Sequence, residues 1–364
     1  MKLLKKEWLF FIFLFLFFFL FFNLKPKFKE IYCFIDWGTI RALSALLLIT
    51  TALKLSGFFD AFAISSVKRF KTERALAFAF VTLSAFLSMF LTNDITLFVM
   101  VPLTLAFSSQ IKNDLTKLVI FEAIAVNVGS ELTPFGNPQN IFLFRQMDIS
   151  VIDFIQKMSI IFIPKIILLI LFVFIFFPKK NLEIEINKTH KTDKFLFISS
   201  IILFVLFIVS LEYSMVRYAL LVIVLYYLFT NYKNVFLKFD YFLIFTFVIM
   251  FIDFGMLSRL EIIKNIMGSI EMDFYNVFNI SIILSQIISN VPAAIFMSNF
   301  SNNYIAIAYG VDIAGNGLLI GSLANIIALR FLKNTKAYID FHKYSIPYFI
   351  VSYLIILVIF CKFI

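Results

Sequence analysis

The sequence predicts an all-α polytopic membrane protein built from two inverted repeats, each with a re-entrant hairpin and a broken transmembrane helix. Of its 364 residues, 62% are hydrophobic and 15% are charged, whereas charged residues make up about 25% of ordinary soluble domains. Apolar runs long enough to cross a hydrocarbon core of about 30 Å recur along the whole chain. Polar, helix-breaking residues interrupt four of these runs, two in each half of the sequence.

The net charge of +10 does not indicate a nucleic-acid partner, because the basic residues lie in short loops between apolar runs. That distribution is typical of the positive-inside rule, and the lipid bilayer is the expected environment. Cys33 and Cys361 lie near opposite ends of the chain, which favours neither a disulfide framework nor a cysteine metal site. His190 and His342 lie in polar connecting segments, where we expect solvated side chains and no ligand role. No resident cofactor is predicted.

Seven continuous apolar runs predict full spans. Lys5 and Lys6 before the first run resemble the start of a signal peptide, but no small-residue cleavage site follows, so we expect a retained span. The expected spans are Trp8 to Phe22, Gly38 to Ser56, Ile155 to Phe177, Phe195 to Leu211, Val216 to Thr230, Phe242 to Gly255 and Tyr344 to Phe360.

Four further apolar segments are interrupted near their middle by Asn, Asp, Gly or Pro: Ala75 to Phe107, Leu118 to Phe144, Asp273 to Asn299 and Tyr304 to Phe331. Such interruptions are typical of re-entrant hairpins and broken helices. If the first and third segments are hairpins and the other two cross, most basic loops fall on one side, with Lys25, Lys27 and Lys29 as the main exceptions. This arrangement predicts a multi-pass protein of the bacterial inner membrane with a cytoplasmic N-terminus.

The same arrangement divides the chain into an N-terminal span and loop (1–37), a first repeat (38–178), a linker with two connecting spans (179–235) and a second repeat (236–364). Each repeat reads as a span, a short amphipathic stretch, a hairpin, a broken helix and a span. Each crosses the membrane an odd number of times, and two spans separate them. The second repeat therefore enters from the opposite face.

The hairpins are expected to turn at Leu91-Thr92-Asn93-Asp94-Ile95-Thr96 and at Ser289-Asn290-Val291-Pro292. Unpaired backbone groups cannot face lipid, so an unwound turn at membrane depth needs a protein-lined or watery cavity. Hydroxyl, amide and carboxylate oxygens, together with freed carbonyls, suit a hard cation such as sodium. We expect Asn93, Asp94, Ser289 and Asn290 to form the ion-binding tips.

The broken helices repeat a pattern after 185 positions (321 minus 136), where Gly136, Asn140 and Arg145 match Gly321, Asn325 and Arg330. Glycines permit unwound backbone, and Pro134 and Pro138 prevent a continuous helix. The second half of each broken helix therefore starts inside the protein with free N–H groups, and its positive dipole end can face an anion.

Three acids lie inside these motifs: Asp94, Glu131 and Asp312. An acid at membrane depth is costly unless it is paired, protonated or bound to an ion, so we expect coupling-ion or proton binding, with Asp94 as the first choice. Capping or salt-bridge roles are the alternative. Lys165 is interpreted as snorkelling or pairing with an acid and is not selected as a site residue. The full predicted substrate and ion site is Thr92, Asn93, Asp94, Ser130, Glu131, Thr133, Gly136, Asn137, Asn140, Ser289, Asn290, Asp312, Asn316, Gly321, Ser322 and Asn325.

At these residues the chain resembles the ion transporter superfamily, which includes the arsenical-pump membrane subunit, the citrate and divalent-anion/sodium symporters and a sodium/proton antiporter branch. The resemblance begins near Gly38 and rests on the two tips and the two helix breaks. It implies two ion sites, substrate held between the tips, an elevator-like movement and a homodimer. Asp94 and Val291 depart from the Ser-Asn-Thr tips of the dicarboxylate symporters and favour the arsenical-pump-like branch.

The sequence thus predicts a secondary active permease of a small, anionic substrate, such as arsenite, another oxyanion or a carboxylate, coupled to a proton or sodium gradient. No nucleotide-binding motif is present, so ATP could enter only through a separate ATPase subunit. A sodium/proton antiporter is the alternative within transport. An intramembrane enzyme is a remote alternative, because the chain lacks a His-Glu-x-x-His motif and a Gly-x-Ser-x-Gly motif. A structural or receptor role gives no reason for duplicated helix breaks.

Overall fold

The computed structural model describes residues 8–58, 61, 72–106, 115–181, 192–332, 334 and 336–363. These residues form α-helices, one 3-10 helix and an isolated β-bridge between Thr72 and Asn181, and they contain no β-strand. The all-α fold class is confirmed. The helices are α2 (Trp8–Leu24), α3 (Phe28–Phe34), α4 (Trp37–Leu55), α6 (Glu73–Ser88), α7 (Asn93–Ala106), α8 (Thr116–Ser130), α9 (Pro138–Gln146), α10 (Val151–Phe176), α11 (Lys194–Glu212), α12 (Val216–Phe229), α13 (Asn234–Lys238), α14 (Tyr241–Leu257), α15 (Glu261–Gly268), α16 (Phe274–Ile288), α17 (Asn290–Met297), α18 (Tyr304–Ala314), η1 (Leu319–Gly321), α19 (Leu323–Arg330) and α20 (Lys336–Phe363).

Each of the seven predicted spans coincides with a helix. Within the described ranges, α4, α10, α11 and α20 are long and apolar enough to cross a membrane, and α14 with α15, bent by 75°, gives a fifth candidate. Two details differ from the expectation. The connecting segment after α2 contains the helix α3, and α20 begins at Lys336, so basic residues predicted in a loop lie on its first turns. The interpretations of Lys5, Lys6 and His190 fall outside the described residues.

Segments from several loops meet at one end of the molecule. Glu73 at the start of α6 forms an ion pair with Lys117 on α8 (3.3 Å), and its backbone N–H donates to the carbonyl of Lys180 after α10 (2.9 Å). The N–H of Asp193 before α11 donates to the carbonyl of Ser56 after α4 (2.9 Å). α6 and α8 therefore both begin at this end of the molecule, as expected if the segment between them is a hairpin.

The opposite end is held by a different set of contacts. Gln146, the last residue of α9, donates to Asp36 before α4 (2.7 Å), and Arg259 after α14 pairs with Glu30 on α3 (2.9 Å). Because α8 starts beside Glu73 and α9 ends beside Asp36, the interrupted segment α8–α9 runs from one end of the molecule to the other. The predicted distinction between a hairpin and a broken helix thus has a direct counterpart in these contacts.

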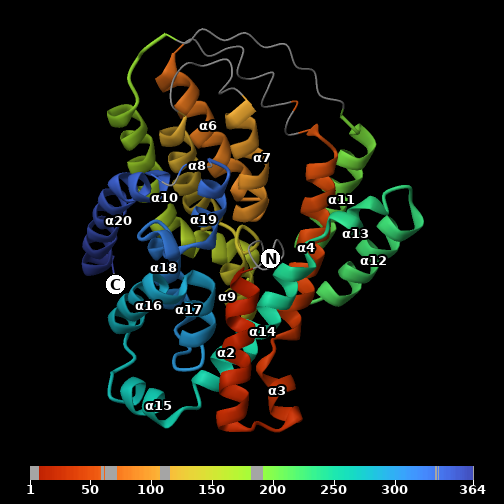
Figure 1. Ribbon diagram of the computed structural model, residues 1–364, viewed down its shortest axis with the longest axis vertical. Coiled ribbons are helices and arrows are strands. Elements are labelled where there is room, and N and C mark those ends of the chain that lie inside the picture. Colours follow the sequence, from red (N-terminus) through yellow and green to blue (C-terminus); the bar gives the residue numbers. More distant parts are fainter. Residues whose placement is uncertain are drawn as a thin grey trace.

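The packing of the two halves follows the same scheme. The first hairpin helix packs on the first part of the broken helix in each half, α6 on α8 and α16 on α18. Figure 1 shows α6, α7 and α8 in the upper part of the molecule and α16, α17 and α18 in the lower part. Both contacts depend on glycine, because a Cβ on Gly129 would lie 1.9 Å from the Ala85 carbonyl oxygen and one on Gly310 would lie 2.5 Å from that of Phe278. The repeat boundaries themselves remain a prediction.

Outer helices enclose this core. α11 and α12 pack on α4, α2 packs on α14, and α10 packs on α20 and α8. Many large apolar side chains on these outer helices are exposed, including Ile175, Ile202 and Leu354. Exposed apolar side chains on long apolar helices are expected where lipid is the solvent. These helices therefore pack around the interrupted segments, although Leu318 and Ile320 in the second break are exposed.

Candidate functional site

The first break lies between the end of α8 at Ser130 and the start of α9 at Pro138. Asn137 caps α9, since its side-chain oxygen accepts the N–H of Asn140 (2.8 Å) and its amide nitrogen donates to the carbonyl of Ser130 (3.2 Å). A Cβ on Gly136 would lie 2.3 Å from the Ser130 carbonyl oxygen. The unwound segment therefore folds back on the end of α8, a path that a side chain at Gly136 would block.

The second break lies between the end of α18 at Ala314 and the start of α19 at Leu323, with η1 inside it. Gln286 on α16 holds this segment, because its amide nitrogen donates to the Ala314 carbonyl (2.9 Å) and its oxygen accepts the N–H of Leu318 (2.6 Å). The glycine at position 317 leaves room for this amide, since a Cβ there would lie 2.5 Å from the Gln286 oxygen.

His342 also holds the second break, which corrects the expectation of a solvated histidine in a loop. It lies on α20 and is half-buried, and its Nε2 accepts the N–H of Leu319 (3.2 Å). Its Nδ1 lies 2.8 Å from the carbonyl of Tyr338 one turn earlier. Because Nε2 accepts, the proton of the neutral ring is on Nδ1 and points to that carbonyl. The expectation was wrong because α20 begins eight residues before the apolar run that predicted it (344 minus 336).

Each hairpin contacts the break of its own half. The N–H of Asn93 at the first tip donates to the Gly136 carbonyl (3.0 Å), and the Thr133 hydroxyl donates to the carbonyl of Met89 (2.5 Å). In the second half, Gln286 on α16 provides the contact with the break, and a Cβ added to Gly315 would lie 3.6 Å from the amide nitrogen of Asn290 at the tip. Each hairpin and the break beside it therefore form one contact unit.

The two breaks are joined to each other by Asn127 and Asp312, which are separated by the same 185 positions (312 minus 127) as the other matched residues. The Asn127 amide donates to the Gly315 carbonyl (3.0 Å) and to the Asn325 oxygen (2.8 Å), and its oxygen accepts from the Ser322 hydroxyl (3.0 Å).

Asp312 makes the reciprocal contacts with the first break. One of its carboxylate oxygens accepts from the amides of Asn137 (3.3 Å) and Gln139 (3.0 Å). Asn137 and Ser322 are again 185 positions apart (322 minus 137). Residues that are 185 positions apart thus take corresponding places in the hydrogen bonds between the two breaks, which is consistent with the predicted repeat.

Lys165 on α10 brings a cation into this polar core. It is 1% exposed, forms an ion pair with Glu131 at the end of α8, and donates to the backbone carbonyl of Asp312 (3.2 Å). An isolated charge is strongly disfavoured in a buried site, so the pairing with Glu131 accounts for the position of both groups. The core therefore contains two carboxylates and one ammonium.

Several buried polar atoms of the core have no hydrogen-bond partner among the described residues. Buried polar groups are nearly always hydrogen-bonded, so a group of unpartnered oxygens indicates a place where water, a proton or an ion binds. These atoms are Glu131 Oε2, Gln139 Oε1, Asn140 Oδ1, Asp312 Oδ2, and Oδ1 and Nδ2 of Asn316.

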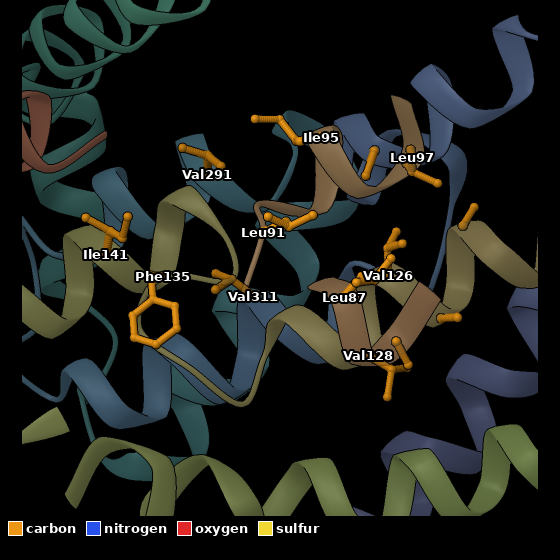
Figure 2. Close-up of a cluster of buried hydrophobic side chains, with 14 of the residues drawn as sticks. Leu87, Leu91, Ile95, Leu97, Val126, Val128, Phe135, Ile141, Val291 and Val311 are labelled. Carbon is orange, nitrogen blue, oxygen red and sulfur yellow. The ribbon is translucent and has the colours of Figure 1, made fainter. Parts of the chain in front are cut away.

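Asp94, the acid that the sequence favours first, takes no part in the hydrogen bonds of this core within the described part of the chain. It is half-buried at the start of α7, and its carboxylate forms no hydrogen bond or ion pair with the rest of the described chain. At the second tip, Val291 is buried in the same apolar cluster as Leu91 and Ile95, which flank the first tip (Figure 2). The structure thus places Glu131 and Asp312 in a central charged core at the breaks, whereas the tips combine buried apolar side chains with the buried polar residues Asn93 and Asn290.

Sequence reasoning left out four residues that the structure brings to the site: Asn127, Gln139, Lys165 and Gln286. Asn127 and Gln139 lie inside the interrupted segment Leu118 to Phe144 but are not among the predicted site residues. Lys165 offered a signal, because it is a lone basic residue in the middle of the apolar run 158–176, and an ionisable residue inside a span is by default a functional candidate. Gln286 gave no comparable signal.

A family model described as citrate transporter matches residues 8–303. The chain belongs to this family. Inner membrane protein YbiR of Escherichia coli K12 is 37% identical over 315 residues, which cover 86% of this chain and 84% of that protein. The uncharacterized transporter MJ0456 of Methanocaldococcus jannaschii is 38% identical over 307 residues, or 83% of this chain and 82% of that protein. The 46 kDa membrane protein of Mycobacterium leprae is 22% identical over 354 residues, or 85% of this chain and 82% of that protein.

The resemblance to the ion transporter superfamily is therefore confirmed. The chain is a multi-pass membrane transporter and not an enzyme.

Proposed function

We propose that the chain is a secondary active permease for a small anion, such as an oxyanion or a carboxylate, coupled to a proton or sodium gradient. The observation that carries the proposal is the central core, where the two helix breaks exchange hydrogen bonds through Asn127 and Asp312 and each is contacted by its own hairpin. Discontinuous helices that meet near the middle of a membrane are the usual construction of substrate and coupling-ion sites in secondary transporters.

Helix direction supports an anionic substrate. α7, α9, α17 and α19 all start at the tips or breaks, so the positive ends of their dipoles point into the interior. A helix N-terminus stabilises negative charge through its dipole and its free N–H groups. The family description adds citrate as one carboxylate to test, and the resemblance to the arsenical-pump branch adds arsenite.

Coupling is assigned to the opposite helix ends. α8 and α18 end at the breaks, and their C-terminal carbonyls and the two acids Glu131 and Asp312 favour a cation there. In discontinuous transporter helices, C-terminal ends and unwound carbonyls take the coupling cation. The four helices that start at the tips and breaks therefore face the anion, and α8 and α18, which end at the breaks, face the proton or sodium ion.

The test is transport by purified protein in proteoliposomes, with Asn93→Ala and Asn290→Ala compared with Asn23→Ala. Asn93 and Asn290 are buried at the tips, whereas Asn23 is exposed at the end of α2 and bonds only its own helix. Citrate, arsenite and phosphate are supplied under imposed proton or sodium gradients. Both tip variants should lose uptake of the transported anion and Asn23→Ala should keep it, whereas full uptake by both tip variants would refute a site at the tips.

A sodium/proton antiporter is the second candidate, and the unpartnered oxygens of Glu131 and Asp312 favour it. In that case the acids themselves are the transport site and no anion is needed. A pH jump across the same vesicles distinguishes the two functions, because sodium-dependent proton flux without any added anion supports the antiporter and rejects the anion permease.

For assembly we propose a homodimer. We also propose that the ion gradient alone drives transport, without an ATPase subunit. Light scattering of the detergent-solubilised protein and transport in ATP-free vesicles test these two points.

A further inference from the structure

The contacts of Lys165 place its ammonium between two helix ends. Its Nζ pairs with Glu131, the residue that follows α8, and donates to the carbonyl of Asp312 in the last turn of α18 (3.2 Å). The ammonium therefore contacts the C-terminal part of both broken helices, one from each half. These are the positions at which we have assigned the coupling cation.

The carbonyl of Asp312 is free to accept this bond because α18 unwinds there. The N–H of Asn316, which would close the next α-helical turn on Asp312, bonds to the carbonyl of Ile313 instead (3.4 Å). A freed carbonyl, a carboxylate and the negative end of a helix dipole are the ligands that a small hard cation uses in an unwound helix. Lys165 supplies a positive charge to that set from a neighbouring helix.

The support around Lys165 fixes its position. Pro164 precedes it inside α10, and the hydroxyl of Tyr348 on α20 donates to its backbone carbonyl (2.7 Å). Tyr348 itself follows Pro347 inside α20, 183 positions later (348 minus 165), close to the offset that relates the two breaks. α10 and α20 thus carry a Pro-Lys and a Pro-Tyr pair at similar places, and only the first provides a charge.

We propose that the Lys165 ammonium is a tethered cation that takes the place of a sodium ion between the ends of α8 and α18. The assignment rests on the proposed function, because it excludes sodium from the coupling site assigned above. Sodium cannot occupy the position of the ammonium while Lys165 is present. A plain structural ion pair is the competing explanation, and it predicts no sodium site when Lys165 is removed.

The groups that face the ammonium are few. Glu131 faces it from the end of α8 and the Asp312 backbone carbonyl faces it from α18, whereas Tyr348 on α20 bonds to the Lys165 backbone carbonyl and not to the ammonium. α6 also packs on α10, but its charged residues Glu73 and Arg74 lie at the other end of α10, beside the residues that follow it. A change at Lys165 therefore acts on a site with one paired acid and one neighbouring acid.

The experiment measures sodium binding directly, without substrate, on purified full-length protein in detergent. Radioactive sodium binding and thermal unfolding are recorded in NaCl and in choline chloride for the wild type, Lys165→Gln, Lys165→Arg and the double variant Lys165→Gln/Glu131→Gln. Lys165→Gln should gain a saturable sodium site that the wild type lacks, and NaCl should raise its melting temperature. Lys165→Arg keeps a cation and the double variant removes the carboxylate, so neither should gain the site.

Equal sodium binding by the wild type and Lys165→Gln would overturn the proposal, as would a sodium site that persists in the double variant. If Lys165→Gln loses its fold, the proposal requires that NaCl restores a monodisperse protein where choline chloride does not, and equal loss in both salts rejects it. Because no substrate is present, these outcomes are independent of the transport test. Sodium-dependent proton flux without an anion in the transport test would refute the anion permease and leave the sodium-binding result unchanged.

Discussion

Asn127 provides the sharpest test of the central core, because one side chain makes three hydrogen bonds to the other half of the chain. It donates to the Gly315 carbonyl and the Asn325 oxygen and accepts from the Ser322 hydroxyl, at 2.8–3.0 Å. Side-chain hydrogen bonds inside membrane proteins average about 0.6 kcal/mol, with a maximum of about 1.7 kcal/mol. Asn127→Ala should therefore cost about 2 kcal/mol of unfolding free energy, from three bonds at the average value.

The assay is equilibrium unfolding of the purified protein in mixed micelles, with Asn23→Ala as the matched control. Asn23 makes one exposed bond to its own helix, so its replacement should change the unfolding free energy by less than about 0.5 kcal/mol. Asn127→Asp adds a second arm, because the carboxylate cannot donate to the Gly315 carbonyl or the Asn325 oxygen and leaves both without that donor. If Asn127→Ala is no less stable than Asn23→Ala, the two breaks are not held together by this side chain and the core described above is wrong.

Three further substitutions test the breaks and tips. Gly136→Ala places a Cβ 2.3 Å from the Ser130 carbonyl oxygen, so it should lower the unfolding free energy by about 1–3 kcal/mol and abolish uptake. Gly268→Ala is the control, because a Cβ there meets nothing within 4 Å, and it should change neither the unfolding free energy nor uptake. Gly310→Ala, with a Cβ 2.5 Å from the backbone of α16, should destabilise by a similar 1–3 kcal/mol or so in the same unfolding assay. Ser289 has a φ of 75° and a ψ of 159°, so Ser289→Gly should raise the melting temperature, and a fall would show that its hydroxyl outweighs about 1–3 kcal/mol of backbone strain.

The elements could be predicted from the sequence because they depend on local patterns. An apolar run such as Ile155 to Phe177 must be a helix in lipid, since every backbone group has to be satisfied within the segment, and it coincides with α10. The interruptions at Asn93 and Gly136 could be located for the complementary reason, because Asn, Gly and Pro signal unwound backbone. His342 was misplaced because α20 extends through polar residues, which pack against the second break and carry no hydropathy signal.

The centre of the site could be predicted only in part. Glu131 and Asp312 were named from the sequence, yet nothing local shows that each half supplies the hydrogen bonds of the other, because those contacts join residues more than 170 positions apart. Asp94 ranked first for the opposite reason. It has the clearest tip motif, but burial and partners are set by the helices packed around it, and these leave Asp94 half-buried and bring Glu131 to Lys165.

The sequence by itself determined that this protein is an all-α membrane transporter with two pairs of interrupted helices, since hydropathy and helix-breaking residues act locally and lipid leaves few alternatives. Only the tertiary structure decided which polar groups meet. Asn127 bonds to the second break, Asp312 bonds to the first, and Lys165 brings a buried ammonium to both. The physical reason is that a buried polar group must find its partner wherever the packed helices place one, and that partner can lie anywhere along the chain.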